Sequence, residues 1–426
     1  MRKYIVPWLI AVVALGALGA AQTRPVTITY SQWGSPEEAE LTRQILDVFM
    51  RENPGIRVNF NHIPSAGDYL QSIQTLIAGG GMPDVFFINN IDFPTLASRN
   101  VFLDLEPFLA RSDKVRRTDF FGALLQAFTW DGRQRVLPRD VSNLVMFYNK
   151  DLFRAAGVPF PTSDWTWDDY LAKAQALTRD TNGDGNKDQW GTSFPTFYLF
   201  WQPFVWSNGG SWLTEDKRQF RLNSPESVEG LQWYVDLRWR HGVAPTPAEA
   251  QDRGPFTMFR TGLIGMHIDG RWRVPALRPV AFDWDVVLFP RGKAGSIVDV
   301  DGSAWGIWRE TRNAEAAWRL VEFFASADTI RKYTERGLII PSRSDIGRSA
   351  AFLNPKERPA NADAFISANH GGRPTETFVA WNEVVAAVNR AMAPVWSGDQ
   401  RSVRAALDAI APEIRQILER AAQRGR

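Results

Sequence analysis

Hydrophobic and polar residues near the start of the chain follow two alternating patterns. Segments 26–31 and 55–63 alternate apolar and polar side chains as half-buried strands do, and 84–88 is a short apolar run typical of a buried strand. Between them, 35–49 and 68–78 carry the spacing of amphipathic helices. This β-α-β-α-β order predicts an α/β fold with a largely parallel sheet, whose ligands lie beyond the carboxyl ends of its strands.

Local signals mark the ends of these first helices. Ser35 is a typical N-cap, Pro36 fits the first helical position, and Glu38 is placed as the acid of a capping box. The glycines at 79–81 predict the end of the second helix.

The rest of the chain continues with both kinds of element and has no repeat, low-complexity tract or linker. Strand-like patterns occur at 135–137, 143–148, 264–268, 285–289 and 304–308, and helical patterns at 166–177, 225–240, 248–259, 314–325, 329–336, 378–392 and 403–422. A chain of 426 residues exceeds what one hydrophobic core usually serves. Two lobes without a single linker indicate that the chain crosses between them more than once.

The first 21 residues have the pattern of a cleaved signal peptide. Arg2 and Lys3 precede an apolar run at 5–18, and small residues at 19–21 offer a cleavage site. The alternative, an anchor helix, conflicts with the shortness of the run. We therefore expect a periplasmic or otherwise extracytoplasmic protein that is not inserted in the membrane. The chain has no cysteine, which excludes a lipoprotein anchor and disulfide bonds.

Charge and composition narrow the class of ligand. The chain has 49 Lys and Arg against 47 Asp and Glu, and because two of the bases lie in the leader, the mature chain is formally neutral. This argues against nucleic acid or anionic membrane as a partner. The chain also has 18 Trp against 8 Tyr. Most of these indoles are expected to pack in the core, but a surplus in an exported protein also suits stacking on a sugar.

Several short motifs occur in the order of a known family. They are GMPDV at 81–85, LPRD at 137–140, FYNKDLF at 147–153, FRTGLIGM at 259–266, DGRW at 269–272, GSAWGI at 302–307 and AAW at 316–318. In these the chain resembles the extracytoplasmic solute-binding proteins of ABC importers, in the sugar-binding group that includes maltose-binding protein. The resemblance covers essentially the whole mature chain.

The resemblance implies a two-lobed, hinged periplasmic-binding-protein fold of the Venus-flytrap type (type II), with crossings near Pro138, Asp299 and Pro341. It further implies a monomer that binds a mono- to oligosaccharide in the inter-lobe cleft and delivers it to the permease subunits, with no reaction and no required cofactor. The expected lobes are 22–138 plus 299–341, and 139–298 plus 342–426.

Candidate ligand-binding residues come from the resemblance and from the chemistry of sugars, whose rings stack their C–H bonds on aromatic faces and whose hydroxyls need groups that accept and donate hydrogen bonds. The resemblance suggests Trp272, Trp381, Ser142 and Ser303, and the residues themselves suggest Trp33, Asn90, Asp92, Arg139, Asp140, Trp206 and Arg343. Structural alternatives stay open. The indoles could pack in the core, Asn90 and Asp92 could be turn or cap residues, Arg139 could pair with Asp140, and Arg343 could face solvent.

Residues 180–188 carry the oxygen-rich spacing of a calcium loop. The candidate ligands are Asp180, Asn182, Asp184, Asn186 and Asp188, with Gly185 at the sixth position. The twelfth position is Gly191 instead of the usual Glu. A structural calcium site and a plain Asx-rich turn both fit this segment.

Two other functions remain open. Trp and carboxylates also line glycosidase clefts, although no motif fixes a catalytic pair and His62, His241, His267 and His370 form no metal motif. Within the receptor class, Arg139 and the acids also suit a glycerol-3-phosphate-type ligand or a polyamine.

Overall fold

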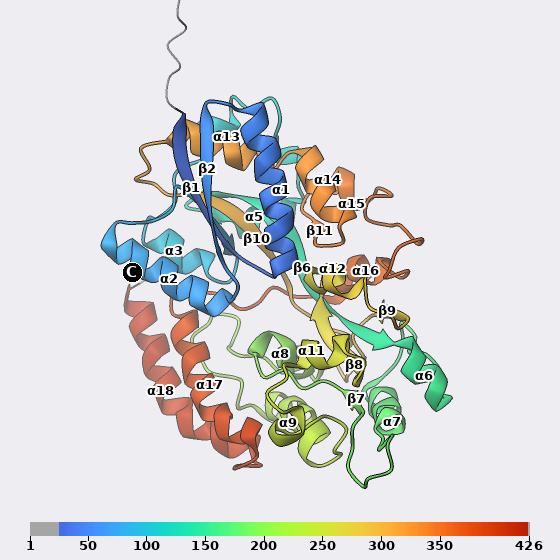
Figure 1. Ribbon diagram of the computed structural model, residues 1–426. Coiled ribbons are helices and arrows are strands. Elements are labelled where there is room, and N and C mark those ends of the chain that lie inside the picture. The colour runs from blue at the N-terminus through green and yellow to red at the C-terminus, as the bar shows by residue number, and fades with distance from the viewer. Residues whose placement is uncertain (1–24, 425–426) are drawn as a thin grey trace, which may run out of the picture.

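The computed structural model describes residues 25–424, so the predicted leader lies outside the described residues. Two lobes lie one above the other in Figure 1, the N-terminal lobe at the top and the C-terminal lobe at the bottom. Each packs helices around strands, and the predicted two-lobed α/β fold is confirmed.

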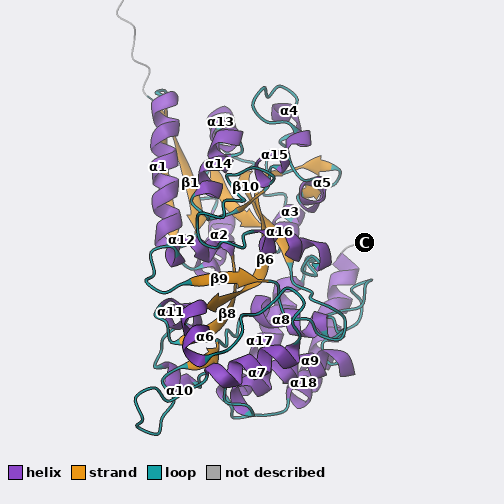
Figure 2. Ribbon diagram, turned by 90° about the vertical axis from the view of Figure 1, so that its right-hand side faces the viewer, coloured by secondary structure: helices purple, strands orange, loops and turns teal. Residues whose placement is uncertain are grey.

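Nine strands form one sheet in the order β2-β1-β3-β10-β6-β8-β7, with β9 and β11 also paired to β6. Their bounds are β1 Val26–Trp33, β2 Ile56–Ile63, β3 Val85–Asn89, β6 Val136–Asn149, β7 Trp190–Thr192, β8 Ile264–Gly270, β9 Trp284–Val287, β10 Val300–Ile307 and β11 Ile340–Pro341. β4 Thr129–Trp130 and β5 Arg133–Gln134 form a separate hairpin. Figure 2 shows β10, β6 and β8 continuing from the upper half of the molecule into the lower half.

The prediction of a largely parallel sheet is wrong. β1 pairs in parallel with β2 and β3, and β7 with β8, but β10 and β6 run antiparallel to every strand they pair with. The two strand patterns at 135–137 and 143–148 belong to one strand, β6, which pairs with β10 in its first half and with β8 and β9 in its second. One strand thus takes part in both lobes.

Helices cover the sheet in both lobes. The N-terminal lobe contains α1 Pro36–Glu52, α2 Ala66–Gly79, α3 Phe93–Ser98, α4 Glu106–Leu109, α5 Gly122–Ala127, α13 Ala314–Phe324, α14 Ala327–Glu335 and α15 Ser344–Gly347. The others are α6 Lys150–Ala156, α7 Trp167–Leu177, α8 Tyr198–Ser207, α9 Pro225–Trp239, α10 Pro247–Ala250, α11 Pro255–Arg260, α12 Val274–Leu277, α16 Asp363–Gly371, α17 Trp381–Ser397 and α18 Val403–Arg424. Short 3-10 turns occupy Arg117–Asp119 and Arg271–Arg273.

Two helix predictions need correction. The pattern at 248–259 is two helices, because Gln251 and Asp252 adopt left-handed φ angles of 49° and 60° and Pro255 starts the second. Ser35 caps α1 as predicted, its hydroxyl accepting a hydrogen bond from the Glu38 amide. The Glu38 carboxylate, however, pairs with Arg139, so no capping box forms.

The hydrophobic core is divided between the lobes. Two clusters of buried side chains lie around β1, β3 and β10 of the N-terminal lobe, and one large aromatic cluster fills the C-terminal lobe. The predicted lobe boundaries at 138, 298 and 341 stay predictions, although α15, just past the last of them, packs Ile346 into an N-terminal cluster. Among residues 25–424, no helix is both long enough and apolar enough to cross a membrane.

Candidate functional site between the lobes

Polar side chains gather where β3, β6 and β10 lie close to the segment that leads into α17. We call this set the inter-lobe polar layer; it consists of Glu38, Asn90, Asp92, Arg139, Asp140, Asp301, Ser303, Thr375 and Asn382. Five of its members, Asn90, Asp92, Arg139, Asp140 and Ser303, are residues that the sequence predicted as ligand contacts.

Arg139 is the charged centre of this layer. Its guanidinium is buried, pairs with Glu38 and with the carboxylate of Asp140 at 2.8 Å, and lies 4.2 Å from the ring centroid of Phe87. Burial alone would lower the pKa of Arg139, but Asp140 and Glu38 together raise it above the usual value. The alternative that Arg139 pairs with Asp140 is therefore confirmed.

Asp140 links β6 to β10. Its Oδ1 accepts hydrogen bonds from the Ser303 backbone amide at 2.9 Å and from the Ser303 hydroxyl at 2.6 Å. Ser142, farther along β6, is half-buried and lies opposite Asp301 in the strand register. The two predicted serines are thus on neighbouring strands, and Ser303 already has a protein partner.

Asn90 and Asp301 form a second buried group in the layer. The Asn90 amide nitrogen donates to Asp301 Oδ1 at 2.8 Å, and the Thr375 hydroxyl donates to Asp301 Oδ2 at 2.6 Å. Burial raises the pKa of Asp301, although both of these hydrogen bonds oppose the shift. Sequence reasoning missed Asp301 and Thr375. The only available signal was the acids at alternate positions of an apolar strand, Asp299 and Asp301.

Asp299 is buried without a partner. Neither of its carboxyl oxygens has a hydrogen bond from any described residue. Burial, and then the charge of Asp301, raise the pKa of Asp299 well above its ordinary value. Burial therefore favours the neutral form of this carboxyl over the charged form.

Asp92 connects the two lobes directly. It precedes α3, and its carboxylate accepts a hydrogen bond from the Asn382 amide in α17 at 3.2 Å. Burial raises the pKa of Asp92 to about 6, and the bond from Asn382 opposes that rise. Asp92 is also the N-cap residue of α3, as the alternative interpretation held, but it caps through its backbone: its side chain makes no cap hydrogen bond, and its amide donates to Asn89 Oδ1 at 3.0 Å.

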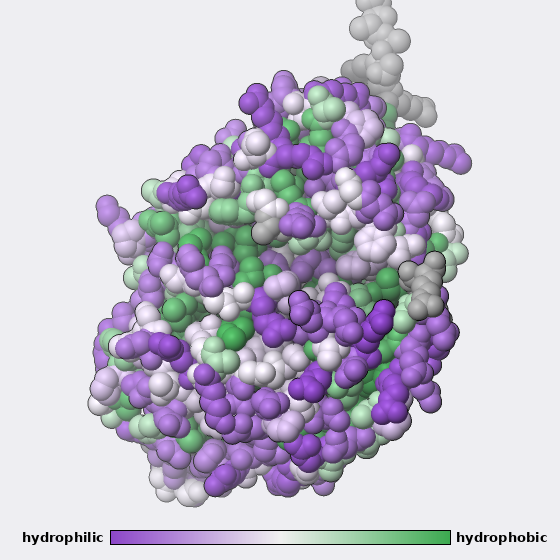
Figure 3. All heavy atoms as spheres, turned by 180° about the vertical axis from the view of Figure 1, so that it is seen from behind, coloured by the Kyte–Doolittle hydropathy of each residue, from purple (hydrophilic) through white to green (hydrophobic). Residues whose placement is uncertain are grey.

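A cavity of about 1190 Å³ lies beside the layer. Its walls come from α5 and the 347–348 turn of the N-terminal lobe, from the crossing strands, and from the 211–221 and 372–377 segments. Figure 3 shows hydrophobic residues gathered in a hollow between the two halves on this face. Within the described residues, Asn90 is the one predicted contact that lines it; Val141, Leu213, Asp301, Ile340 and Arg373 are further lining residues.

The predicted aromatic contacts do not line this cavity within the described part of the chain. Trp206 and Trp381 are buried in the C-terminal core, with Trp381 4.9 Å from the Trp212 ring. Their proposed place on a cleft wall is therefore corrected to the core. Trp33 is half-buried against Phe87, and half-buried Trp272 contacts the cores of both lobes.

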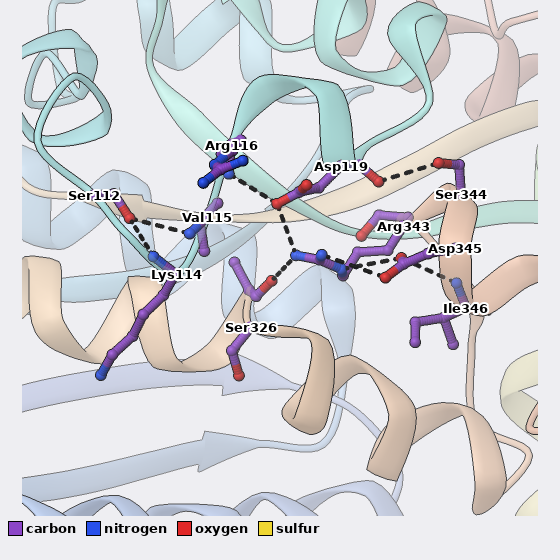
Figure 4. A network of polar contacts seen from close by, with 12 residues as sticks. Ser112, Lys114, Val115, Arg116, Asp119, Ser326, Arg343, Ser344, Asp345 and Ile346 are labelled. Carbon is purple, nitrogen blue, oxygen red and sulfur yellow. Dashed lines mark hydrogen bonds and ion pairs between the residues drawn. The ribbon is translucent and has the colours of Figure 1, made fainter.

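Arg343 also departs from both of its predicted roles. It is buried, and its guanidinium pairs with Asp119 and Asp345, each at 3.2 Å. Figure 4 shows this network joining the loop before α5 to the start of α15, within the N-terminal lobe. The residue is neither exposed to solvent nor part of the inter-lobe polar layer.

The 180–188 loop is exposed and held by its own hydrogen bonds. Asp180 accepts from the Gly183 amide at 2.7 Å and the Gly185 amide at 2.8 Å, and backbone amides lower its pKa. Among residues 25–424, no group of three acidic or histidine side chains is arranged to hold a metal. These hydrogen bonds are those of an Asx-rich turn, and the calcium site, including Asn182, Asp184, Asn186 and Asp188, stays a prediction.

Comparison with known proteins places this geometry in a family context. The family model described as bacterial extracellular solute-binding protein matches residues 33–330. A putative binding protein of Brucella abortus (strain 2308) is 24% identical over 412 residues, which are 93% of this chain and 94% of that protein. The maltotriose-binding protein of Pyrococcus abyssi is 20% identical and covers 73% of this chain and 65% of its own length.

Solved structures give the same picture. An ABC substrate-binding protein from Listeria monocytogenes in complex with cycloalternan is 28% identical, with a TM-score of 0.86 over 93% of this chain and 99% of that one. The maltose-bound MalE3 protein of T. maritima has a TM-score of 0.78 at 21% identity, covering 92% of this chain and all of its own. The second similarity concerns the fold alone.

Proposed function

The chain belongs to the bacterial extracellular solute-binding proteins, and from that premise we propose that it captures a carbohydrate between its lobes for an ABC importer. The observation that carries this proposal is the likeness to the Listeria protein, which spans almost all of both chains and whose structure contains an oligosaccharide. The family consists of binding proteins, so the sugar is expected to leave chemically unchanged.

The polar layer supports this proposal chemically. Sugar hydroxyls both donate and accept hydrogen bonds, and the layer offers carboxylates, amides and two hydroxyls at the boundary between the lobes. Asp92 and Asn382 come from different lobes and contact each other, so a ligand that replaces this contact would touch both lobes. A ligand favours the closed arrangement only by the difference between its affinities for the two forms.

The wider setting is part of the same proposal. The basic, apolar and small-residue order of the first 21 residues supports export through a cleaved leader. The formal neutrality of the mature chain suits an uncharged ligand. We accordingly propose a monomeric extracytoplasmic receptor that needs no cofactor and meets membrane permease subunits.

A ligand screen tests this function. Maltose, maltotriose, cycloalternan, glycerol-3-phosphate and a polyamine are added separately, and the melting temperature is measured, because a ligand bound only by the native protein raises it. Chromatography of each incubated sugar checks for products. We expect a sugar to raise the melting temperature and to be recovered intact. Sugar cleavage would contradict the receptor function, and a response only to the phosphate ester or the polyamine would contradict the carbohydrate.

A further inference from the structure

A second pocket, of about 470 Å³, lies at the junction of the lobes away from the polar layer. It is bounded by α14 of the N-terminal lobe, by the segment around α12, and by the loop between α15 and α16; α14 and α12 lie one above the other on the right of Figure 1. Its charged lining residues are Arg271, Arg278, Arg331, Arg358, Glu335 and Glu357. We call it the Arg271 pocket.

Arg271 is buried in this pocket without an anionic partner. The residue is 3% exposed, and its Nε and Nη1 have no hydrogen-bond acceptor among the described residues. The guanidinium lies 4.1 Å from the ring centroid of Phe352 and 5.4 Å from that of Phe365. Aromatic faces attract a cation, but they leave its in-plane N–H groups without acceptors.

The other charges of the pocket do not neutralise Arg271. Arg278 already pairs with Glu357 at 2.7 Å, and Arg358 donates to backbone carbonyls, including that of Phe282 at 2.8 Å. Burial and the nearby charge of Arg278 lower the pKa of Arg271 to about 9, despite Glu357. Four arginines and two glutamates leave an excess of two positive charges in the lining.

We propose that the Arg271 pocket binds a small soluble oxyanion of the phosphate type, with Arg271 as its main ligand and Arg331 at the exposed rim. A guanidinium presents a planar fork of donors that matches the oxygens of such an anion. Hydrogen phosphate carries about two negative charges at neutral pH, which matches the excess positive charge of the pocket lining. A planar monocarboxylate carries half of that charge and is expected to bind more weakly.

The position of the pocket gives the anion a structural consequence. Arg331 belongs to α14, whose Ile330 and Tyr333 pack in the N-terminal core, whereas Phe352 and Phe365 pack in the C-terminal core. An anion held by Arg271 and Arg331 therefore connects the two lobes at a place separate from the proposed sugar site. The inference does not depend on the identity of the transported ligand.

Calorimetric titration with inorganic phosphate tests the inference, at pH 7.5 and constant ionic strength set with sodium chloride. Wild-type protein is expected to bind phosphate saturably, and Arg271→Gln is expected to weaken binding by about tenfold or more, the loss typical of a hydrogen bond to a charged group. Arg331→Gln should weaken it less. Sodium acetate in place of phosphate should bind more weakly than phosphate.

Arg238→Gln is the matched control. Arg238 is also buried, lies 3.9 Å from the ring centroid of Phe194 and has an unpartnered Nε, but it is outside the Arg271 pocket. Its variant should bind phosphate as the wild type does. The proposal would be overturned if the wild type did not bind phosphate saturably or if acetate bound as tightly as phosphate. Equal losses of affinity in Arg271→Gln and Arg238→Gln would also overturn it. If Arg271→Gln does not fold, Arg271→Lys replaces it in the titration, because lysine keeps the positive charge but lacks the planar pair of donors of a guanidinium.

Discussion

The inter-lobe polar layer and the Arg271 pocket each hold a buried arginine, but the surroundings of the two guanidinium groups differ. Arg139 pairs with two carboxylates, whereas Arg271 faces aromatic rings and another arginine. A buried charge that is paired within the protein contributes to the stability of the fold. Its removal leaves the charges of its partners buried and unpaired in a low-dielectric environment. Arg271 has no ion pair with any described residue, and its place in the lining of a pocket is the reason for proposing an anion from solution as its partner.

The largest expected effect comes from breaking the paired site. Arg139→Met leaves the carboxylates of Glu38 and Asp140 buried without a cation, and we expect it to lower the free energy of unfolding by about 3–5 kcal/mol. Urea denaturation measures the change. Arg43→Met removes an exposed pair with Glu40, 3.6 Å long, and as the control should change stability by less than about 1 kcal/mol. Similar stabilities for the two variants would contradict a structural role for Arg139.

The second prediction concerns Asp92, the carboxylate of the layer whose one side-chain partner among residues 25–424 is the amide of Asn382. Its pKa is about 6 in the folded protein, above that of the unfolded chain, so the folded protein binds the extra proton between these values. Protonation of Asp92 therefore stabilises the folded protein at low pH, and this contribution to the free energy of unfolding is lost as the pH rises through about 6. Asp92→Asn should abolish a fall in stability of up to about 3 kcal/mol between roughly pH 4 and pH 7.

Urea denaturation at several pH values compares the wild type with Asp92→Asn. The two curves should converge on the acidic side, and the wild type should decline more steeply toward neutral pH. Parallel curves would show that Asp92 does not titrate in this range and that the layer neutralises this carboxylate in another way.

The smallest expected effect sharpens the contrast with Arg139. Arg271→Met removes a charge that has no anionic partner to leave behind, at the expense of its contact with Phe352. In phosphate-free buffer we expect the free energy of unfolding to change by about 1 kcal/mol or less. A loss of the size expected for Arg139→Met would mean that Arg271 is neutralised within the fold, which would remove the contrast between the two sites.

Local features of the fold were predictable because they depend on neighbouring residues. Ser35 caps its helix as its position indicates, and the strand predicted at 84–88 is found as β3, with residues 85–88 buried. The direction of β6 and β10 was not predictable, since a period of two residues marks a strand without giving its partner. The break at Gln251 likewise depends on backbone angles that no residue type there requires.

The site was predictable only in part for a similar reason. Asn90, Asp140 and Ser303 follow or occupy strands whose ends meet between the lobes, so their gathering could be foreseen. The partners Asp301 and Thr375 are separated by 74 positions, and no local pattern joins them. Composition also could not tell a core indole such as Trp381 from one at a lobe boundary such as Trp272.

Calorimetric titration of the sugar found in the screen into wild type, Trp272→Ala and Trp308→Ala tests the central claim that a carbohydrate binds between the lobes. Trp272 contacts both cores, whereas Trp308 follows the last residue of β10, at the opposite end of that strand from Asp301 of the layer. We expect Trp272→Ala to weaken binding by about tenfold or more, through loss of an aromatic contact, while Trp308→Ala binds like the wild type. Equal affinity in all three proteins would contradict a sugar site at this boundary.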